Sequence, residues 1–425
     1  MLYYTVRFVS NIGVRVFFRK IYVSNLDLIQ DDKPIIFAVN HPTAFLDPVL
    51  IEAFIKTTVH FIVRGDVFNN KIARAILTDL KMIPIFRFRD GYSNLKSNQG
   101  SMDFCYKTLS QRKNILILAE GETKHEKRLR PIQKGTARMA FGAIEKYGDL
   151  DVLVVPIGVN YTDSNRFRSE VMIEIGEAIH VKELVPLYRE DPRKAIKQLT
   201  DAIEVGMRKH VIHIADEKDD EMVNHFLMIQ RNDIEKSLFP AVSSSNELLK
   251  KEHGAVEIIN SMDQKVKEQF RNAIQDYQRE LNYHACKDVG IAQVQKYHIV
   301  NTLIIFLGFV PFVFGVIMNG FPLWVAVYFA DSKVKKIEFH SSMRYVVGML
   351  GYIFYWLLFF VMALVSDSNL FLSVVFIAPF LGMFSLFYSE LLAKWRAAKR
   401  VNSLSKEVQG ILNGKRAKIF KNLRS

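Results

Sequence analysis

The sequence predicts an α/β fold with a mainly parallel sheet flanked by helices, followed by a helical segment and a C-terminal helical transmembrane region. Up to about residue 185, short apolar runs rich in β-branched residues alternate with helical patterns, which is typical of βαβ units. Residues 186–298 are charged and helical in pattern, with one break at 240–245. After Ile299, three segments of about 20 residues or more carry no charge, as a membrane-spanning helix requires.

Residues 1–23 predict an interfacial amphipathic helix. The segment is apolar but carries Arg7, Arg15, Arg19 and Lys20, which is not the pattern of a cleavable signal peptide. Its aromatic side chains would lie against a membrane while the cations reach lipid phosphates. An ordinary helix packed on the rest of the protein is the alternative.

The α/β domain is predicted over residues 24–185, where three apolar runs each stop in a polar or turn residue. These runs are 83–87 (IPIFR), 115–123 (ILILAEGET) and 152–159 (VLVVPIGV). The elements predicted around them are helices over 49–60, 69–80 and 97–110 and a last strand region over 171–181. Ligands of parallel sheets collect beyond the carboxyl ends of the strands, so we expect the polar ends of these runs to meet there.

His41 and Asp47 are the strongest candidates for a catalytic pair. A neutral imidazole can accept a proton near pH 7, and a neighbouring carboxylate fixes its tautomer and stabilises the imidazolium that forms. Five residues separate the two side chains in the sequence. That spacing does not place them on one helix face, so a non-helical turn must bring them together. Capping of a helix start is the competing interpretation of such a pair.

Four sequence blocks in this order resemble the glycerolipid acyltransferase family, whose members make phosphatidic acid and remodel phospholipids. The blocks are NHPTAFLDP (40–48), IPIFR (83–87), LAEGET (118–123) and VVPI (154–157). The sequence departs from the family pattern twice: five residues rather than four separate His41 and Asp47, and Ala119 stands where proline is usual. A branch that resembles fungal glycerol-3-phosphate and dihydroxyacetone-phosphate acyltransferases shares the longer spacing, and the downstream sequence QKGTA is closer to that branch.

The resemblance implies a membrane-bound O-acyltransferase of phospholipid biosynthesis. It would move a fatty acyl group from acyl-CoA or acyl carrier protein to a hydroxyl of a glycerophosphate acceptor, with His41 as general base and Asp47 orienting it. The residues that the resemblance assigns to acceptor binding, or that are weaker candidates for phosphate contacts, are Arg87, Glu120, Gly121, Thr123, Arg64 and Lys134. The implied reaction requires no cofactor and no metal, and its partners are membrane lipids and the acyl donor.

Several functions stay open on the sequence alone. Lysophosphatidate and glycerol 3-phosphate are nearly equal as the acceptor, and the longer His-Asp spacing favours the latter. Alternatives are an acyltransferase for a different lipid acceptor, in remodelling or on an amino-acid lipid, and a catalytically inactive membrane scaffold of the same fold. A transporter is disfavoured because the C-terminal segments lack intramembrane charges and repeats.

The net charge of +13 is unevenly distributed along the chain. Residues 122–135 hold a basic cluster that either binds phosphate groups of a substrate or lies in solvent. Residues 390–425 carry ten Lys or Arg against two Glu, a net +8, and follow an apolar region. The partner expected for this basic tail is therefore an anionic membrane surface rather than nucleic acid.

Cysteine and histidine spacing predicts neither a disulfide framework nor a metal site. The chain has two cysteines, Cys105 and Cys286, which we expect to be buried thiols. His210 and His213 are three residues apart on a predicted helix, but no third ligand is nearby in the sequence.

The transmembrane region is predicted over residues 299–389. Its first segment, 299–330, is too long for one simple span and short for two, which predicts a re-entrant or two-helix hairpin with a turn at Asn319-Gly320. Two ordinary spans are predicted at 345–365 and 370–389.

Charges in the loops predict the orientation of these spans. The loop 331–344 carries four cations, whereas the loop 366–369 carries only Asp367. The positive-inside rule then places the first loop and the basic tail in the cytoplasm. The α/β domain should face the same side, because its acyl donors are cytoplasmic. The membrane would be a bacterial inner membrane or an endoplasmic reticulum.

Overall fold

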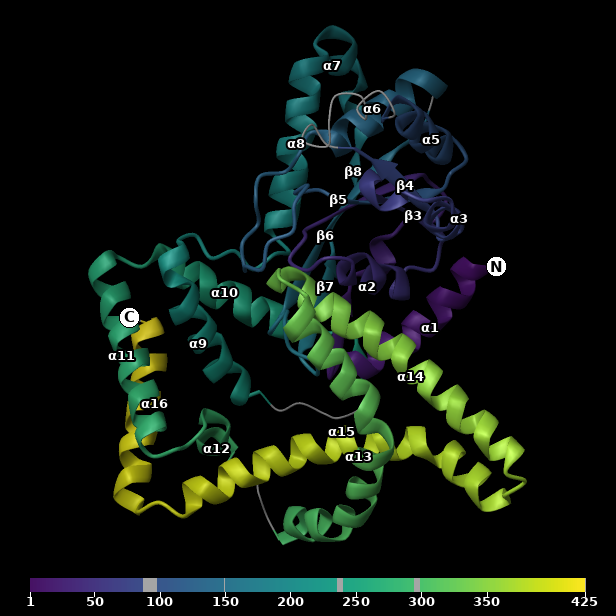
Figure 1. Cartoon of the computed structure of the whole chain (residues 1–425). Helices are drawn as coiled ribbons and strands as arrows, with labels where there is room; N and C mark the ends of the chain where they lie inside the picture. The colour runs from purple at the N-terminus through teal and green to yellow at the C-terminus, as the bar shows by residue number, and fades with distance from the viewer. Residues whose placement is uncertain (87–97, 149, 235–239, 294–298, 425) are drawn as a thin grey trace. The chain divides into compact units, whose positions relative to one another are not determined.

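The computed structural model describes residues 1–86, 98–148, 150–234, 240–293 and 299–424 of the 425-residue chain. These residues divide into two compact units (Figure 1). Residues 1–213, 239–250 and 336–342 form the first, which we call the sheet unit. The second, which we call the helical unit, consists of residues 214–238, 251–335 and 343–425.

The sheet unit is built on one nine-stranded sheet. Its order is β4-β3-β5-β2-β6-β7-β1-β9, and β8 pairs with β6 beside this path. The strands are β1 (Lys20–Ser24), β2 (Ile35–Val39), β3 (Val59–Arg64), β4 (Met82–Ile85), β5 (Asn114–Leu118), β6 (Leu153–Tyr161), β7 (Glu170–Ile175), β8 (Ile179–His180) and β9 (Val242–Ser243). All pairs are parallel except β6–β7 and β6–β8. The predicted mainly parallel α/β fold is confirmed.

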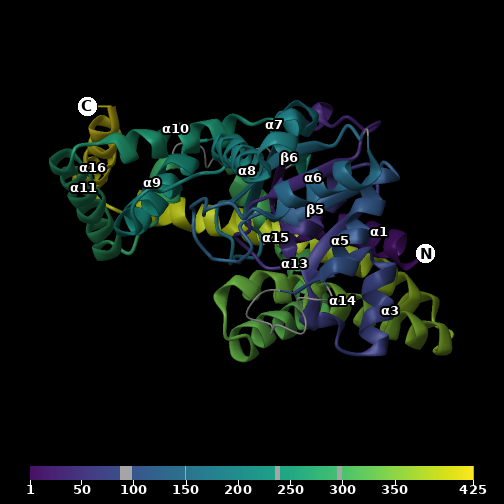
Figure 2. The ribbon, with the colours of Figure 1, turned by 90° about the horizontal axis from the view of Figure 1, so that it is seen from above.

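Helices cover the sheet and close its core. They are α1 (Leu2–Phe17), α2 (Leu46–Phe54), α3 (Lys71–Asp79), α5 (Asn98–Ser110), α6 (Gly135–Tyr147), α7 (Val185–Glu190) and α8 (Pro192–Arg208). Helices α5, α6 and α8 lie beside β5 and β6 in the view of Figure 2. Ala38 of β2 packs in one buried cluster with Leu109, Ala140 and Ile203 of these helices. This close-packed layer holds the central strands in place.

The ends of three neighbouring strands are in register. Val39, the last residue of β2, is paired with Leu118 of β5 on one side and Ile157 of β6 on the other. Because β2, β5 and β6 are parallel, the residues that follow β2 and β5 leave the sheet at one edge, beside the last part of β6. The candidate residues at 40–47 and 119–123 are therefore brought together, as expected.

The N-terminal segment differs from the single helix predicted over 1–23. Helix α1 ends at Phe17, and Lys20–Ser24 forms β1, which pairs with β7 and β9. The sequence KIYVS, in which β-branched Ile21 and Val23 flank Tyr22, favours this strand once distant partners exist. Helix α1 packs on α2 with one face, while Tyr4, Phe8 and Ile12 leave an exposed apolar stripe on the other.

Two further boundaries differ from prediction. The helix predicted over 49–60 is α2, which ends at Phe54 because β3 begins at Val59. The sheet unit also extends beyond the boundary predicted at residue 185, since Leu199 and Ile203 of α8 are fully buried in its core. The predicted helical segment 186–298 thus contributes one helix layer and the edge strand β9 to this unit.

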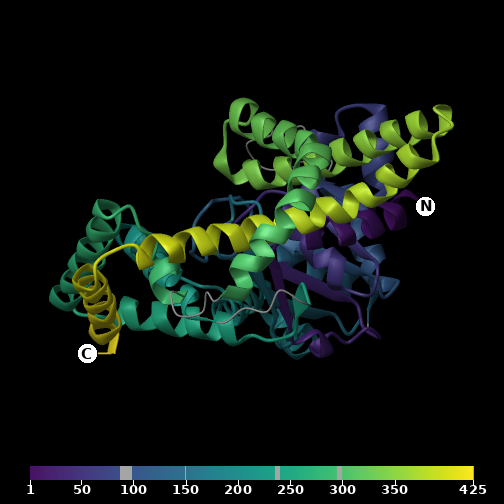
Figure 3. The same ribbon diagram turned by 90° about the horizontal axis from the view of Figure 1, so that it is seen from below.

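Three helices among the described residues have the length and apolar composition needed to cross a membrane, at 301–333, 337–365 and 369–402. The helices of the helical unit are α9 (Asp220–Asn232), α11 (Gln264–Tyr283), α12 (Asp288–Gln293), α13 (Ile299–Lys333), α15 (Asn369–Asn402) and α16 (Lys406–Arg424), together with most of α10 (Glu247–Ser261) and α14 (His340–Val365). Helix α15 packs against α13, and Figure 3 shows the yellow α15 crossing the green α13. These helices support the predicted association with a membrane.

The hairpin predicted over 299–330 is wrong in one respect: α13 passes through Asn319-Gly320 as one helix without a turn. Asn319 Nδ2 donates to the carbonyl oxygens of Gly315 and Ala378, both at 2.9 Å, and Oδ1 accepts from the Tyr352 hydroxyl at 2.8 Å. These bonds join α13 to α14 and α15. They give a polar side chain partners inside an apolar helix group, which explains why it does not end the helix.

The basic tail predicted over 390–425 is also helical, formed by the end of α15 and by α16. Lys415 of α16 pairs with Glu280 at 2.7 Å and with Asp276 at 3.1 Å, both on α11. Part of the tail's net charge is therefore neutralised within the helical unit, because α11 presents acidic side chains to α16.

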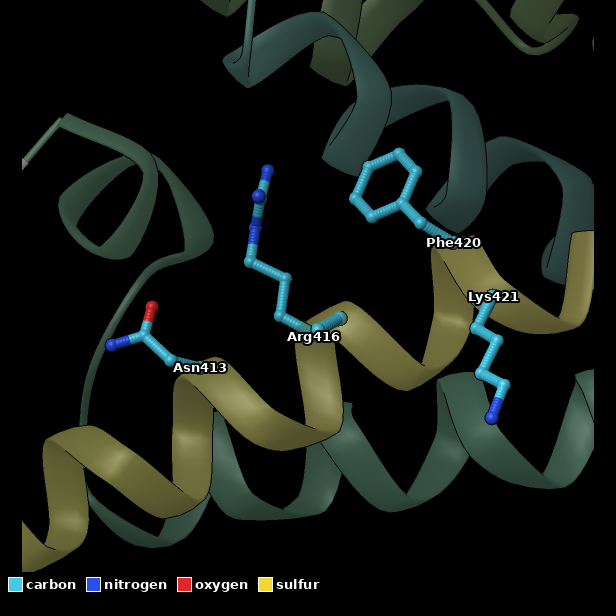
Figure 4. A pocket seen from close by; sticks show the side chains of 5 residues that line it. Asn413, Arg416, Phe420 and Lys421 are labelled. Atoms are coloured by element: carbon cyan, nitrogen blue, oxygen red, sulfur yellow. The ribbon is translucent and has the colours of Figure 1, made fainter.

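Helix α16 also lines a pocket of the helical unit (Figure 4). The lining residues are Asn413, Arg416, Ala417, Phe420 and Lys421. The guanidinium of Arg416 pairs with Asp233 at 2.7 Å and with Asp288 at 2.8 Å. Because these carboxylates already hold it, Arg416 acts as a structural cation that ties α16 to the end of α9 and to α12.

Candidate active site

His41 leaves the sheet at the end of β2, where its neighbour Asn40 is locked to β6. The Asn40 side chain accepts from the Val159 backbone N–H at 2.7 Å and donates to the Val159 carbonyl at 2.9 Å. The His41 backbone is fixed in turn: its N–H donates to Glu120 Oε2, and its carbonyl accepts from the Lys124 N–H. Both β6 and the loop after β5 therefore position the histidine.

The chain then returns to His41 through a non-helical turn and the start of α2. Asp47 is the second residue of this helix and is fully buried, while His41 is 9% exposed. His41 Nδ1 lies 3.0 Å from Asp47 Oδ2. The turn that the five-residue spacing requires is thus present, and the two side chains meet as the sequence predicts.

Asp47 receives three further donors, from two residues that the sequence did not single out. The Thr43 hydroxyl donates to Oδ1 at 2.5 Å and the Thr43 N–H donates to Oδ2 at 3.0 Å. The Tyr161 hydroxyl, from the last residue of β6, donates to Oδ1 at 2.7 Å. Burial and the Asp47 charge hold the pKa of Tyr161 well above its usual range, so the phenol stays a neutral donor. The Asp47 carboxylate is therefore held both by its own loop and by the end of β6.

These bonds decide the tautomer of His41. Asp47 is an acceptor, so His41 Nδ1 carries the proton and donates it to Oδ2. The other ring nitrogen, Nε2, then has its lone pair available as a base. The Thr123 hydroxyl lies 2.5 Å from Nε2 and donates to it. Thr123 therefore places a hydroxyl at the ring nitrogen that does not face Asp47.

Glu120 is placed in the site, but both its oxygens are engaged by the protein. Oε2 accepts from the His41 N–H at 3.1 Å, and Oε1 accepts from the Arg130 N–H at 3.1 Å. Burial raises the pKa of Glu120, while Arg130 and the His41 N–H act in the opposite direction. Gly121 follows with φ +75°, a left-handed conformation that favours glycine, and an added Cβ would meet the Gln133 side chain at 3.0 Å. Glu120 and Gly121 thus shape the turn that lies beside His41.

The other predicted site residues lie elsewhere. Arg64 bonds to Asp66 rather than to any group of the His-Asp pair and is half exposed. Lys134 is exposed just before α6. Arg87 lies outside the residues that the structure describes.

The basic cluster predicted over 122–135 supplies one cation next to the site. Arg130, 20% exposed, places Nη2 3.5 Å from Glu120 Oε2, the oxygen that also holds the His41 N–H. Within the same loop, Glu126 pairs with Lys124 at 2.9 Å and with Arg128 at 3.2 Å. The loop is thus internally bridged, and the Arg130 guanidinium lies beside the carboxylate that holds the His41 N–H.

Among the residues that the structure describes, no group of three or more His, Cys, Asp or Glu is arranged to hold a metal. The two histidines considered above have other partners: His210 Nδ1 lies 2.9 Å from Glu174 Oε2, and His213 Nδ1 accepts from the Leu129 N–H at 3.1 Å. Cys105 and Cys286 are free and buried.

Comparison with known proteins places this site in a family. The model of the family described as Acyltransferase matches residues 20–160, which contain the strands and loops around His41. These residues form an acyltransferase-family domain. The sequence prediction of the family is therefore confirmed.

Relatives of the acyltransferase domain include two yeast proteins. Glycerol-3-phosphate O-acyltransferase 1 of Saccharomyces cerevisiae is 35% identical over 114 residues, 26% of this chain and 15% of that protein. Glycerol-3-phosphate O-acyltransferase 2 of the same yeast is 31% identical over 115 residues, 27% of this chain and 15% of that protein. The match thus spans about a seventh of each curated yeast relative.

A solved structure also resembles this chain. The 1-acyl-sn-glycerophosphate (LPA) acyltransferase of Thermotoga maritima shares 19% sequence identity with a TM-score of 0.34. The alignment covers 47% of this chain and 79% of that one.

Proposed function

We propose that this chain is a membrane-bound O-acyltransferase that moves a fatty acyl group from a thioester to a hydroxyl of glycerol 3-phosphate. The observation that carries the proposal is the ordered set Asp47, His41 and Thr123, in which a hydroxyl already donates to the free nitrogen of an oriented imidazole. The acceptor is proposed because two yeast relatives of the domain are named glycerol-3-phosphate O-acyltransferases.

In the proposed reaction, the acceptor hydroxyl replaces Thr123 at His41 Nε2. As its oxygen attacks the thioester carbonyl, the proton passes to His41 and Asp47 stabilises the imidazolium. The new C–O bond forms, the C–S bond breaks, and His41 returns the proton to the departing thiolate. General base catalysis of this kind typically contributes about 10²–10⁴-fold. The thioester supplies the leaving group, so we propose no resident cofactor.

Cations near the histidine would hold the acceptor phosphate. Arg130 lies beside Glu120, the residue whose carboxylate accepts a hydrogen bond from the His41 N–H. Its planar guanidinium can pair with phosphate oxygens. For Arg87 we keep the role that the sequence predicts, binding of the acceptor. Gly121 supplies the left-handed turn after Glu120, while Glu120 supports the histidine loop rather than meeting substrate.

We also propose that the acyltransferase domain faces the cytoplasm at a membrane surface. Three apolar helices of spanning length follow it in the chain, and α1 of the same sheet unit exposes an apolar stripe at Tyr4, Phe8 and Ile12. The donor would be acyl-CoA or acyl carrier protein, and the product would be delivered directly into the bilayer.

The test is acyl transfer by the full chain reconstituted in liposomes. Labelled acyl-CoA and acyl carrier protein would each be supplied with glycerol 3-phosphate or with lysophosphatidate, using wild type, His41→Ala and the control His253→Ala on α10. We expect lysophosphatidate as the product from glycerol 3-phosphate, lost in His41→Ala and kept in His253→Ala.

Each other result selects a different function. Product from lysophosphatidate alone would replace the proposed acceptor. Folded protein that acylates neither acceptor would favour another lipid acceptor or an inactive scaffold. Transfer that survives His41→Ala would contradict the general base mechanism.

A further inference from the structure

A short segment from the C-terminal half of the chain belongs to the sheet unit. Residues 336–342, which we call the connector, join α13 to α14 and contain the 3₁₀ turn Ile337–Phe339 and the first residues of α14. Ser341 and Ser342 are 1% and 0% exposed. A connector between two apolar helices would ordinarily be solvated, so this burial needs a cause.

The connector contacts the loop between His41 and Asp47. The Ala44 backbone N–H donates to the Glu338 carbonyl at 3.1 Å, and the Leu46 backbone N–H donates to the Ser342 hydroxyl at 3.2 Å. The second bond joins residues 296 positions apart in the chain. Both bonds lie in the turn that brings Asp47 to His41.

The Ser342 bond satisfies a donor at the start of α2. The first N–H groups of a helix have no partner within it and are usually capped by a nearby side chain. Here the N-cap residue of α2 is Phe45, which has no side chain able to accept a hydrogen bond. Leu46 is the first residue of α2 and Asp47 the second, so Ser342 fixes the turn from which Asp47 reaches His41.

The connector also approaches the loop after β5. Glu338 and His340 both act on the pKa of His125, the former raising it and the latter lowering it, although burial is the larger cause and lowers it. His125 follows two residues after Thr123, whose hydroxyl lies at His41 Nε2. The connector therefore borders both loops that build the site.

We propose that the connector is a positioning element of the candidate active site, in which Ser342 caps α2 and thereby holds Asp47 against His41. Its role in catalysis rests on the proposed acyl transfer. Because the connector is covalently continuous with α13 and α14, the site is complete only when this C-terminal helix pair is in place. Loss of the helix pair would then disable the His-Asp pair without changing any residue of the acyltransferase domain.

The first experiment tests docking without requiring activity. The backbone contact at 3.1 Å holds the Cα atoms of Ala44 and Glu338 within about 7 Å, near the reach of a disulfide. Full-length protein with Ala44→Cys and Glu338→Cys, oxidised in liposomes, should yield the disulfide-linked peptide pair by mass spectrometry. The control pairs Ala44→Cys with Ser366→Cys, at the other end of α14, and should stay unlinked. Failure of the first pair to link would overturn the proposal.

The second experiment tests positioning through kinetics. Ser342→Ala should lower kcat on the order of tenfold, as loss of a helix cap near a catalytic carboxylate predicts, with little change in KM for the donor. Ser342→Thr, which keeps the hydroxyl, should recover most of kcat. Ser341→Ala removes an equally buried hydroxyl that does not bond to Leu46 and should resemble wild type.

Two outcomes would overturn the positioning role. One is an unchanged kcat in Ser342→Ala, and the other is an equal loss in Ser341→Ala, which would indicate general destabilisation. A linked Ala44→Cys/Glu338→Cys pair in a protein with no acyl transfer would leave docking established and would contradict the proposed function alone.

Discussion

The hydroxyl of Tyr161 donates to Oδ1 of Asp47 over 2.7 Å, at the point where β6 leaves the sheet. The same oxygen accepts from Thr43, and the other carboxylate oxygen faces His41. Asp47 is therefore held from the sheet, from its own loop and from the histidine. The hydroxyls of Tyr161 and Thr43 both bond to Oδ1, so Oδ2 is the oxygen that orients the imidazole.

Replacing Tyr161 by Phe should lower kcat of acyl transfer by on the order of tenfold. Removal of a hydrogen bond to a buried charged group costs about 1.5–3 kcal/mol, part of which falls on the geometry of the His-Asp pair. The measurement is kcat and KM of the reconstituted variant. Tyr188→Phe is the matched control, because its hydroxyl also donates to a carboxylate, that of Glu145 at 3.2 Å, outside the site. Equal activity in both variants would contradict the role given to Tyr161.

Thr123 separates direct transfer from a covalent mechanism. A hydroxyl at His41 Nε2 is either a stand-in for the acceptor or a nucleophile that carries the acyl group itself. We predict the former, so Thr123→Ala should retain kcat within roughly tenfold, since the substrate hydroxyl replaces one neutral hydrogen bond. Wild-type protein incubated with labelled donor and no acceptor should hold no acyl group on the peptide containing residue 123. A trapped acyl-threonine, lost in Thr123→Ala together with activity, would favour the covalent route.

Glu52 makes the stability of the acyltransferase domain depend on pH. Burial raises its pKa to about 7, although the Tyr3 hydroxyl and Arg7 partly oppose this. Between the ordinary value of 4.5 and about 7, the folded protein then binds more protons than the unfolded chain. The contribution of Glu52 to the free energy of unfolding is therefore fully present below about pH 4.5. It is lost as the pH rises to about 7, by at most about 3 kcal/mol.

The check is the thermal midpoint in detergent at pH 5 and pH 8, for wild type and Glu52→Gln. Glutamine keeps an oxygen that accepts from Tyr3 but does not titrate. The wild-type midpoint should fall by more over this interval than that of the variant. Parallel pH profiles for the two proteins would show that Glu52 is not the titrating group.

The central strands can be predicted from the sequence because their signals are local. The runs that form β5 and β6 are apolar and β-branched without alternation, as strands buried on both faces are. Strand β1 is not recognised, because its five residues follow an amphipathic helix directly and its partner β7 lies about 150 residues later. Non-local pairing of this kind leaves no signature in the short segment itself.

The candidate site divides in the same way. His41, Asp47 and Glu120 can be found from sequence blocks, because each stands at a fixed distance from a strand end. Tyr161 gives one weak signal, a polar residue two positions beyond the predicted run 152–159. Ser342 gives none, since its role depends on a contact across 296 positions of the chain.

Two contacts, one in each unit, predict how many of the apolar helices would cross a membrane. Within the helical unit, Lys415 of α16 pairs with Glu280 of α11, which precedes all three apolar helices. Both must lie on one side of the membrane, so an even number of crossings separates them. Within the sheet unit, the Ala44–Glu338 bond places the connector on the side of the acyltransferase domain. Helix α13 should then begin and end on that side, while α14 and α15 each cross.

Single cysteines at exposed positions test this topology, in a background where Cys105 and Cys286 are replaced by serine. The positions are Lys209 in the sheet unit, Lys335 before the connector, Asp367 between α14 and α15, and Lys406 at the start of α16. A membrane-impermeant maleimide applied to oriented vesicles should label 209, 335 and 406 from one side and 367 from the other. That pattern agrees with the cations of the loop 331–344 facing the cytoplasm. If α13 crossed once, 335 and 406 would label opposite to 209, and the contacts of Glu338 and Lys415 could not both form in the membrane.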